Sequence, residues 1–320
     1  MIARYRRELS VAAAFGALLL VLAVANADFF KAANLRAIVL KEAPVLVAAV
    51  GMTLVILARH IDISIGSQFS ICGAVAALLA KAGLPLAAVA AGTLAAGALM
   101  GALNGALVAL LRLPSIVVTL ATMVSLEAAL KWERSGEAIS HASDRFYFAG
   151  LGQAGGQAAI VATALAVFAL FAWGLRHLAA GRAVYAVGSD LEAARLAGIR
   201  PGRVVFAVFV AMGLLAALAA LLTSIQFRTI QPNEGKGLEL KVIAAVVVGG
   251  VAISGGRGTL AGTLIGVLFL GSIGTALVFL RAESYWEKAI QGAIILVAVA
   301  SDAINLRKKK PDAGAHLASS

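Results

Sequence analysis

Long apolar runs separated by short polar stretches make up most of this 320-residue chain. A helix needs about 20 mostly apolar residues to cross a bilayer. The runs are continuous rather than alternating, which excludes a transmembrane β-barrel, so we expect an all-α polytopic membrane protein. The pattern predicts about ten transmembrane helices, near residues 9–26, 43–58, 66–81, 84–111, 114–130, 157–179, 204–225, 240–254, 258–280 and 286–305.

The composition supports a membrane protein and argues against a nucleic-acid partner. Hydrophobic residues make up 61% of the chain and charged residues 13%, whereas a soluble domain carries about a quarter charged residues. The net charge of +11 fits the Lys and Arg that membrane proteins gather in cytoplasmic loops. We therefore expect contact with membrane lipid and not with nucleic acid. The single cysteine, Cys72, excludes an intrachain disulfide.

The placement of Lys and Arg predicts which loops are cytoplasmic. Basic residues cluster at both ends of the chain, and an N-terminus inside places 15 of the 27 basic residues in inner loops. An even number of spans puts both termini in the cytoplasm with the loop over 181–203, and the loops at 131–156 and 226–239 outside. We expect a transmembrane domain over 1–306 and a disordered basic tail over 307–320.

An internal similarity relates the fourth and ninth predicted spans. Residues 91–107 and 261–277 are identical at 7 of 17 aligned positions. Because these spans lie an odd number of crossings apart, two copies would run in opposite directions, as in transporters with inverted repeats. An inverted five-helix repeat is one interpretation, and chance similarity in a chain rich in Ala, Leu and Gly is the other.

The sequence carries no pattern of an enzyme. The cluster Gly255-Gly256-Arg257-Gly258-Thr259 lacks the spacing and the Lys of a phosphate loop. The four histidines are scattered without metal-ligand spacing, and no Ser stands in a GxSxG turn. We predict no catalytic residue, no metal site and no cofactor, and we expect that the protein does not encode its own source of energy.

The polar stretch GSDLEAARLAGIRPGR interrupts the apolar runs and carries helix signals. Ser189 and Glu192 fit a capping box, and Asp190 adds negative charge to the first turn. Gly198 suits the C-terminal cap, so the pattern predicts a helix over 190–197. Two isolated helical turns are marginal in water, and this helix therefore either lies on the bilayer surface or docks on a partner.

Several polar side chains stand at or near membrane depth, where they are costly unless paired or hydrated. They either line a path for a polyhydroxylated substrate or serve the structure, through hydrogen bonds between helices. For Asp62 the structural alternative is a cap on the next helix through Ser64 or neighbouring amides. The path candidates are Asp62, Ser64, Asn104, Thr119, Thr122 and Glu239.

Paired glycines at 249–250 and 255–256 interrupt the apolar residues that follow Glu239. They indicate either a discontinuous helix beside a transport path or close crossings between helices. The sequence favours neither interpretation over the other.

Taken together, these stretches resemble the membrane permease subunits of monosaccharide ABC importers of the ribose, xylose and galactose type. They occur in the family's order through most of the chain, which makes the match specific although each motif alone is weak. The similar pieces are IDISIGS (61–67), Asn104-Gly105, LPSIVVTLATM (113–123), residues 181–199 with the core VGSDLEAARLAGI, GKGLELKVIAAVVVGG (235–250) and SGGRGTLAGTLIG (254–266).

The resemblance implies the permease fold of the vitamin-B12 importers, placed in the bacterial inner membrane. It implies a dimer with a second copy or a paralogue, two cytoplasmic ATPase subunits and a periplasmic binding protein that delivers the sugar. Glu192-Ala193-Ala194 followed by Gly198 keeps the EAA-x3-G spacing of permease coupling loops, without the later Leu-Pro, which implies a helix that docks on the ATPase. The implied coupling residues are Ser189, Asp190, Leu191, Glu192, Ala193, Ala194, Arg195 and Gly198.

Two departures from the family pattern leave the substrate open. Many members carry Gly-Gly where this chain has Arg59-His60. The stretch GGVAISGGRG also lacks the small hydroxyl residues that are common in the family after the first glycine pair. In this second feature the chain resembles the rhamnose and autoinducer-2 branches. Permeases for nucleosides, autoinducer-2 or branched-chain amino acids are the nearest alternatives. An ion-coupled secondary transporter, which needs intramembrane carboxylates, and a scaffolding membrane protein are alternatives of other classes.

Overall fold

A computed structural model describes residues 6–140, 145–283 and 285–308 of the chain. The described residues are mostly helical. The helices in chain order are α1 (Arg6–Ala25), the 3-10 helix η2 (Ala27–Phe30), α2 (Ala32–Leu57), α3 (Ile65–Lys81), α4 (Leu86–Ala109), α5 (Ser115–Arg134), the 3-10 helix η3 (Tyr147–Gly150), α6 (Gly152–His177), α7 (Ala179–Ser189), α8 (Leu191–Leu196), α9 (Pro201–Ser224), α10 (Leu238–Val248), α11 (Leu260–Phe279) and α12 (Trp286–Lys308).

Each of the ten predicted ranges lies mainly on one of these helices, α1 to α6 and α9 to α12. The range 240–254 was wrong at its end, because α10 stops at Val248. Six of them, α2, α4, α5, α6, α9 and α11, are long and apolar enough to cross a membrane. The apolar part of α1, Leu9–Ala25, and α3 are shorter apolar helices. The all-α fold of a multi-pass membrane protein is confirmed, whereas the number of crossings and the inverted repeat stay predictions.

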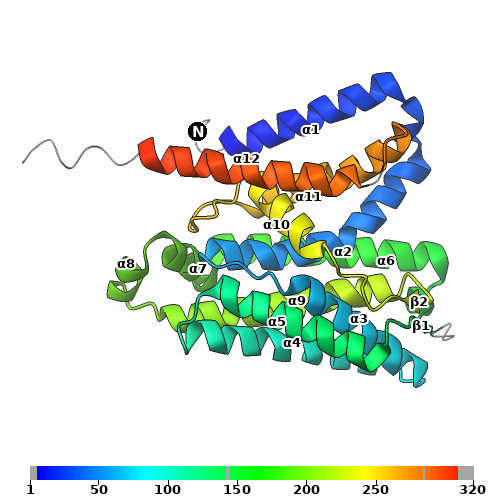
Figure 1. Cartoon of the computed structure of the whole chain (residues 1–320), viewed down its shortest axis with the longest axis horizontal. Coiled ribbons are helices and arrows are strands. Elements are labelled where there is room, and N and C mark those ends of the chain that lie inside the picture. The colour runs from blue at the N-terminus through cyan, green and yellow to red at the C-terminus, as the bar shows by residue number, and fades with distance from the viewer. Residues whose placement is uncertain (1–5, 141–144, 284, 309–320) are drawn as a thin grey trace, which may run out of the picture.

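One small sheet was not predicted. Strands β1 (Ile139–Ser140) and β2 (Thr229–Ile230) pair antiparallel, with Ile139 opposite Ile230. The two strands come from the loops after α5 and after α9, so they join parts of the chain that are far apart in sequence. They lie together at the end of the molecule opposite α8 (Figure 1).

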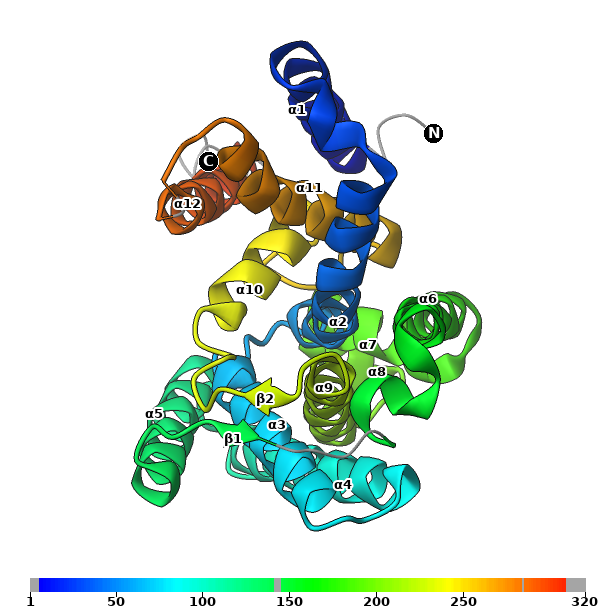
Figure 2. The same cartoon turned by 90° about the vertical axis from the view of Figure 1, so that its right-hand side faces the viewer.

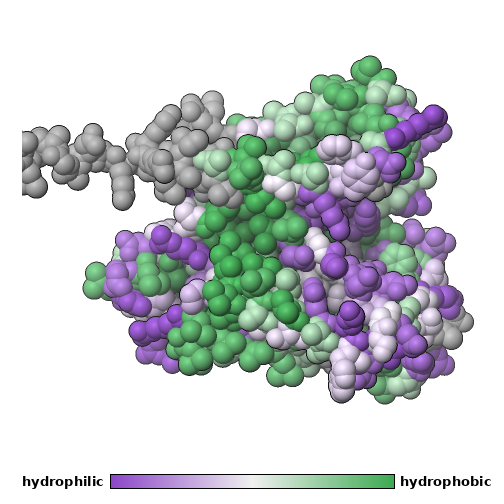
Figure 3. Space-filling view, viewed as in Figure 1, coloured by the Kyte–Doolittle hydropathy of each residue, from purple (hydrophilic) through white to green (hydrophobic). Residues whose placement is uncertain are grey.

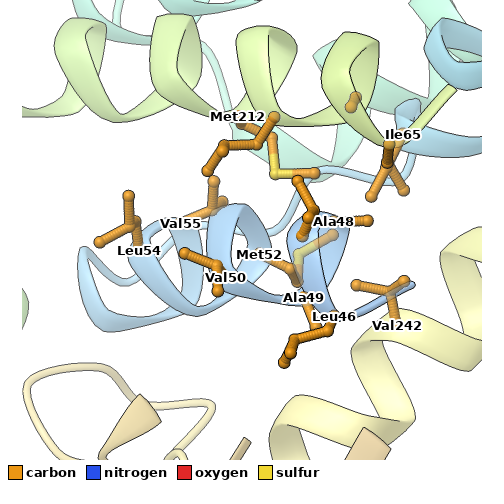
Figure 4. Packing of buried hydrophobic residues seen from close by; sticks show 14 of the residues in the cluster. Leu46, Ala48, Ala49, Val50, Met52, Leu54, Val55, Ile65, Met212 and Val242 are labelled. Carbon is orange, nitrogen blue, oxygen red and sulfur yellow. The ribbon is translucent and has the colours of Figure 1, made fainter. Parts of the chain in front are cut away.

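Helix α2 lies at the centre of the bundle, with α9, α10, α11 and α6 around it (Figure 2). Every residue from Leu46 to Leu57 is buried. Met212 of α9, Ile65 of α3 and Val242 of α10 pack around this stretch (Figure 4). Because lipid tails are as apolar as Leu, such packing in a membrane stabilises the bundle through close contact rather than through loss of water.

Glycines permit a close helix crossing between α4 and α9. Gly97 and Gly101 of α4 face α9, and Gly213 of α9 faces α4. A Cβ atom on any of the three would overlap the backbone of the facing helix. Small residues at such positions let two backbones approach within van der Waals distance, and this explains the glycine-rich composition of α4.

On the face shown in Figure 3, an apolar band separates two hydrophilic ends of the molecule. Figure 1 places α8 at one end and β1 with β2 at the other, and Figure 3 shows the apolar band between them on one face. Large apolar side chains are exposed on the outer helices, with Leu99 of α4 72%, Leu170 of α6 62% and Leu296 of α12 70% exposed. This surface is suited to contact lipid.

The glycine pairs after α10 interrupt a span, and they also permit close packing. Helix α10 ends at Val248 after 11 residues, which is about half of the ~30 Å hydrocarbon core at 1.5 Å per residue. Residues 249–259 then form a linker before α11. A Cβ atom on Gly249 would overlap the carbonyl group of Gly262. The glycines therefore both follow the end of α10 and permit a close crossing, while a transport path beside them stays a prediction.

Candidate functional site

The loop predicted over 181–203 covers most of α7, all of α8 and the start of α9. Helices α7 and α8 lie at one end of the molecule (Figure 1). Asp190 is the N-cap of α8, because its Oδ1 accepts hydrogen bonds from the amides of Glu192 at 2.9 Å and Ala193 at 3.0 Å. The predicted capping box, with Ser189 as the cap, was therefore wrong. Ser189 is instead the last residue of α7, a helix that the sequence pattern did not predict.

Helix α8 covers six residues, one fewer at each end than predicted. Gly198 follows it with a φ of +79°. The amides of Gly198 and Ile199 donate to the carbonyl groups of Arg195 and Ala194. These two bonds form a Schellman motif, in which glycine is preferred at the left-handed position. The predicted role of Gly198 as the C-terminal cap is confirmed.

One side of α8 packs inward and the other faces outward. Ala194 is buried, at 3% exposed, and holds α8 against the rest of the protein. Leu191 is 39% exposed and Leu196 is 90% exposed. Between them, Glu192 and Arg195 form an exposed ion pair at 2.5 Å. We call these four outward residues the α8 face. Leu196 was missed from the sequence, although its spacing of four from Glu192 places it on the same side.

Four polar side chains form a buried network where α3 begins. Oδ1 of Asp62 accepts from the amide of Ser64 at 2.9 Å and from its hydroxyl at 2.6 Å. Oδ2 of Asp62 accepts from Nε2 of Gln68 at 3.2 Å. The Ser64 hydroxyl accepts from Gln68 at 2.8 Å and from Nδ2 of Asn104 on α4 at 2.8 Å. All four side chains are buried.

Side chains in the first turn of α5 form hydrogen bonds with the linker of residues 58–64, which joins α2 to α3. The hydroxyl of Thr119 accepts from the amide of Ile63 at 3.1 Å and donates to the carbonyl of Ser115 at 2.8 Å. The hydroxyl of Ser115 accepts from the amide of Ile61 at 3.3 Å. Helices α3, α4 and α5 thus meet around a short stretch of non-helical backbone, whose amides need such partners away from water.

The remaining two path candidates lie nearby. Thr122, half-buried on α5, donates to the carbonyl groups of Val118 and Thr119 in its own helix. The carboxylate of Glu239 accepts from the amide of Gly237 at 3.1 and 3.2 Å, at the start of α10. A Cβ atom on Gly66 would overlap this carboxylate, so the first turns of α3 and α10 are in contact.

The geometry agrees with the structural roles weighed from the sequence. Asp62 accepts the Ser64 amide, as a cap would, and Asn104 bonds across helices. The network also keeps unused capacity: among the residues that the structure describes, none donates to Oε1 of Gln68 or to Oδ1 of Asn104. Gln68 was not predicted, but its position four residues after Ser64 puts both on one side of α3.

Comparison with known proteins agrees with this architecture. The family model described as branched-chain amino acid transport system / permease component matches residues 34–299. The ribose import permease protein RbsC of Escherichia coli (strain K12) is 36% identical over 293 residues, 89% of this chain and 91% of that protein. RbsC of Haemophilus influenzae is 35% identical over 289 residues, 89% of this chain and 90% of its own length.

A second group of relatives has another printed substrate. The autoinducer 2 import system permease protein LsrC of Enterobacter sp. (strain 638) is 35% identical over 290 residues, 91% of this chain and 84% of that protein. No solved structure matches the chain. Since the family model covers most of the chain and these relatives align along nearly all of it, the chain belongs to the family of branched-chain amino acid transport system permease components.

Proposed function

We propose that this chain is the permease subunit of a bacterial ABC importer and forms the translocation pathway for a monosaccharide. A periplasmic binding protein would deliver the sugar, and a separate ATPase would power transport. The similarity to two ribose import permeases supports the sugar. The observation that carries the coupling to an ATPase is the α8 face, where Leu191 and Leu196 are exposed at a hydrophilic end of the molecule.

The α8 face has the chemistry of a docking surface. Its two leucines supply apolar area for a groove, and the pair of Glu192 and Arg195 supplies charged contacts beside it. The ATPase that docks there would act from the cytoplasm. Docking of the ATPase alone does not drive transport, because ATP binding must favour one conformation of the permease over another.

The same proposal orients the molecule in the inner membrane. The end with α8 and both chain termini face the cytoplasm, and the end with β1 and β2 faces the binding protein. The apolar band contacts lipid, and a second permease, another copy or a paralogue, completes the dimer. The concentration of Lys and Arg near both termini and in the loop over 181–203 supports this orientation.

We propose that the sugar passes beside the starts of α3 and α10. Two short helices begin there, and polar side chains at that depth bond to one another. When α3, α4 and α5 separate, sugar hydroxyls can take over these bonds without leaving buried groups unpaired. The proposed path residues are Asp62, Ser64, Asn104, Thr119, Thr122 and Glu239.

A charge reversal on the α8 face tests the coupling. The variant Leu191→Asp with Glu192→Arg is expressed with the partner ATPase that co-purifies with the parent chain. We expect normal insertion in the membrane, loss of the co-purifying ATPase and loss of ribose uptake. The matched control is Leu151→Asp with Glu137→Arg, two exposed residues near the end with β1, and it retains the ATPase. Normal uptake in the first variant would overturn the coupling role.

Autoinducer-2 is the second candidate substrate, because LsrC is as similar to this chain as RbsC is. Uptake of labelled ribose and of labelled autoinducer-2 in the same cells distinguishes the two. The same assay tests the class of transporter. Uptake that an uncoupler abolishes and ATP depletion spares would indicate an ion-coupled secondary transporter instead.

A further inference from the structure

Three segments meet directly behind α8. The last carbonyl of α2, on Leu57, accepts a hydrogen bond from the amide of Gly256 at 2.9 Å. Gly256 belongs to the linker of residues 249–259 between α10 and α11. Gly188, near the end of α7, lies against both: a Cβ atom there would overlap the Leu57 carbonyl oxygen and stand 2.7 Å from the Gly256 nitrogen. We call Leu57, Gly188 and Gly256 the glycine junction.

Two side chains of α7 reinforce the glycine junction. The Tyr185 hydroxyl donates to the carbonyl of Gly258 at 2.9 Å. The Ser189 hydroxyl donates to the carbonyl of Gly256 at 3.4 Å. A Cβ atom on Gly256, whose φ is +69°, would overlap the Ser189 hydroxyl. Helix α7 therefore touches the linker along its last turns through backbone atoms and short contacts.

The glycine junction is only one residue from the α8 face. Ser189 ends α7, Asp190 caps α8, and Leu191 begins the face. At Gly188 the contact is between backbone atoms, so no side chain lies at that point to absorb a displacement. The linker in turn is joined to α10 and bonded to the end of α2, so a displacement of α8 would have a continuous path to both helices.

The geometry points to the glycine junction as the element that transmits movement of the docked ATPase to the interrupted span α10, with Gly188, Gly256 and Tyr185 as positioning residues. This inference rests on the proposed function, because the ATPase is the source of the movement. It adds the route inside the permease: α8 to α7, α7 to the linker, and the linker to α10.

Close packing alone is the competing explanation. Glycines also occur where two backbones simply need to approach, as between α4 and α9. Packing predicts that a substitution in the glycine junction lowers stability and leaves the coupling of ATP hydrolysis to transport unchanged. Transmission predicts that coupling falls while the ATPase stays bound.

The experiment follows the linker directly. Arg257 is exposed on the linker, and the chain has one cysteine, Cys72, which is buried. Arg257→Cys therefore carries an environment-sensitive fluorophore at a single position. The labelled chain is assembled with the ATPase in proteoliposomes, and fluorescence is recorded before and after addition of ATP with vanadate. Ribose uptake and ATP hydrolysis are measured on the unlabelled complex.

Two variants perturb the glycine junction to different degrees. Gly188→Ala places a methyl group against the Leu57 carbonyl, and Tyr185→Phe removes one hydroxyl while its ring is kept. The matched control is Gly202→Ala, in the first turn of α9, where a Cβ atom meets only the Ala109 carbonyl oxygen, at 3.4 Å. Tyr185→Phe keeps the test valid if Gly188→Ala does not fold.

We expect ATP to change the fluorescence in the parent chain and in Gly202→Ala. The change is lost in Gly188→Ala and reduced in Tyr185→Phe, with the ATPase still bound. Ribose transported per ATP hydrolysed falls about fivefold or more in Gly188→Ala, the range of a typical coupling free energy. An ATP response that both variants retain, or a parent chain that gives none while its ATPase is bound, overturns the inference. An ATPase that never binds the parent chain overturns the proposed function as well.

Discussion

Glu42 of α2 and Lys241 of α10 form a buried ion pair, with 2.6 Å between Oε1 and Nζ. The Glu42 side chain is 2% exposed and that of Lys241 is 12% exposed. Gly271 of α11 makes room for Glu42, since a Cβ atom there would overlap its side chain. Within the described parts of the chain, no donor reaches Oε2 of Glu42. The pair fastens the short helix α10 to the central helix α2.

Removing one partner of this pair is expected to destabilise the protein strongly. Glu42→Leu or Lys241→Met each leaves a buried charge without its partner, at a cost of about 3–5 kcal/mol. The double variant removes both charges and recovers most of that loss. Thermal unfolding in detergent measures all three, and the exposed pair of Lys31 and Asp28 serves as the control with little change. If the double variant lost as much stability as the two single variants lose together, the result would contradict the pairing.

The sequence located the spans because a membrane helix requires a fixed length of apolar residues, which is a local property. It missed the ion pair because the span predicted over 43–58 begins just after Glu42 and so leaves that side chain outside the membrane helix. In the structure α2 continues back to Ala32, and α10 and α11 bury Glu42. Partners 199 residues apart are brought together by tertiary packing, which no local pattern encodes.

The network around Ser64 gives a second prediction. Ser64→Ala removes the acceptor of the Asn104 and Gln68 amides and one donor to Asp62. Leaving buried polar groups unpaired costs about 1–3 kcal/mol, so we expect a lower melting temperature in detergent. Ser272→Ala is the control, because this buried hydroxyl donates to Leu268 in its own helix. Equal shifts in the two variants would contradict a shared network.

The candidate path residues were found from polarity at membrane depth, and five of the six surround the start of α3. That much follows from sequence, since polar groups in a membrane need partners and gather for that reason. Which of these side chains bond to one another could not be predicted from the sequence. Whether Asn104 bonds to Ser64 or to a substrate depends on the separation of α3 and α4, and a linear pattern carries no such distance.

Arg59 gives a third prediction, because it occupies a position suited to glycine. Its φ is +70°, and the amides of Arg59 and His60 donate to Ile56 and Val55 in a Schellman motif at the end of α2. A left-handed conformation costs an L-residue about 1–2 kcal/mol. Glycine avoids this cost, but the greater conformational entropy that it gives the unfolded chain offsets part of the gain. Arg59→Gly is therefore expected to raise the melting temperature.

The matched control for this position is Arg257→Gly. Arg257 lies on the facing linker, and its φ is not in the left-handed region. Glycine there adds freedom to the unfolded chain without relieving strain, so the melting temperature is expected to fall. A fall in Arg59→Gly as large as that in Arg257→Gly would show that the left-handed conformation carries no cost at position 59.

The N-cap of α8 gives the last prediction, because the structure and the sequence pattern assign this cap to different residues. Both Ser189 and Asp190 are good N-cap residues, and the pattern favoured Ser189, whereas Asp190 accepts the two amides. Asp190→Ala removes about 1 kcal/mol of helix stability, so the ATPase binds about fivefold more weakly. Asp190→Asn keeps the cap and the affinity, and Ser189→Ala leaves the affinity unchanged. Titration of the ATPase onto detergent-purified permease measures all three, and a loss of affinity in Ser189→Ala but not in Asp190→Ala would restore the capping box.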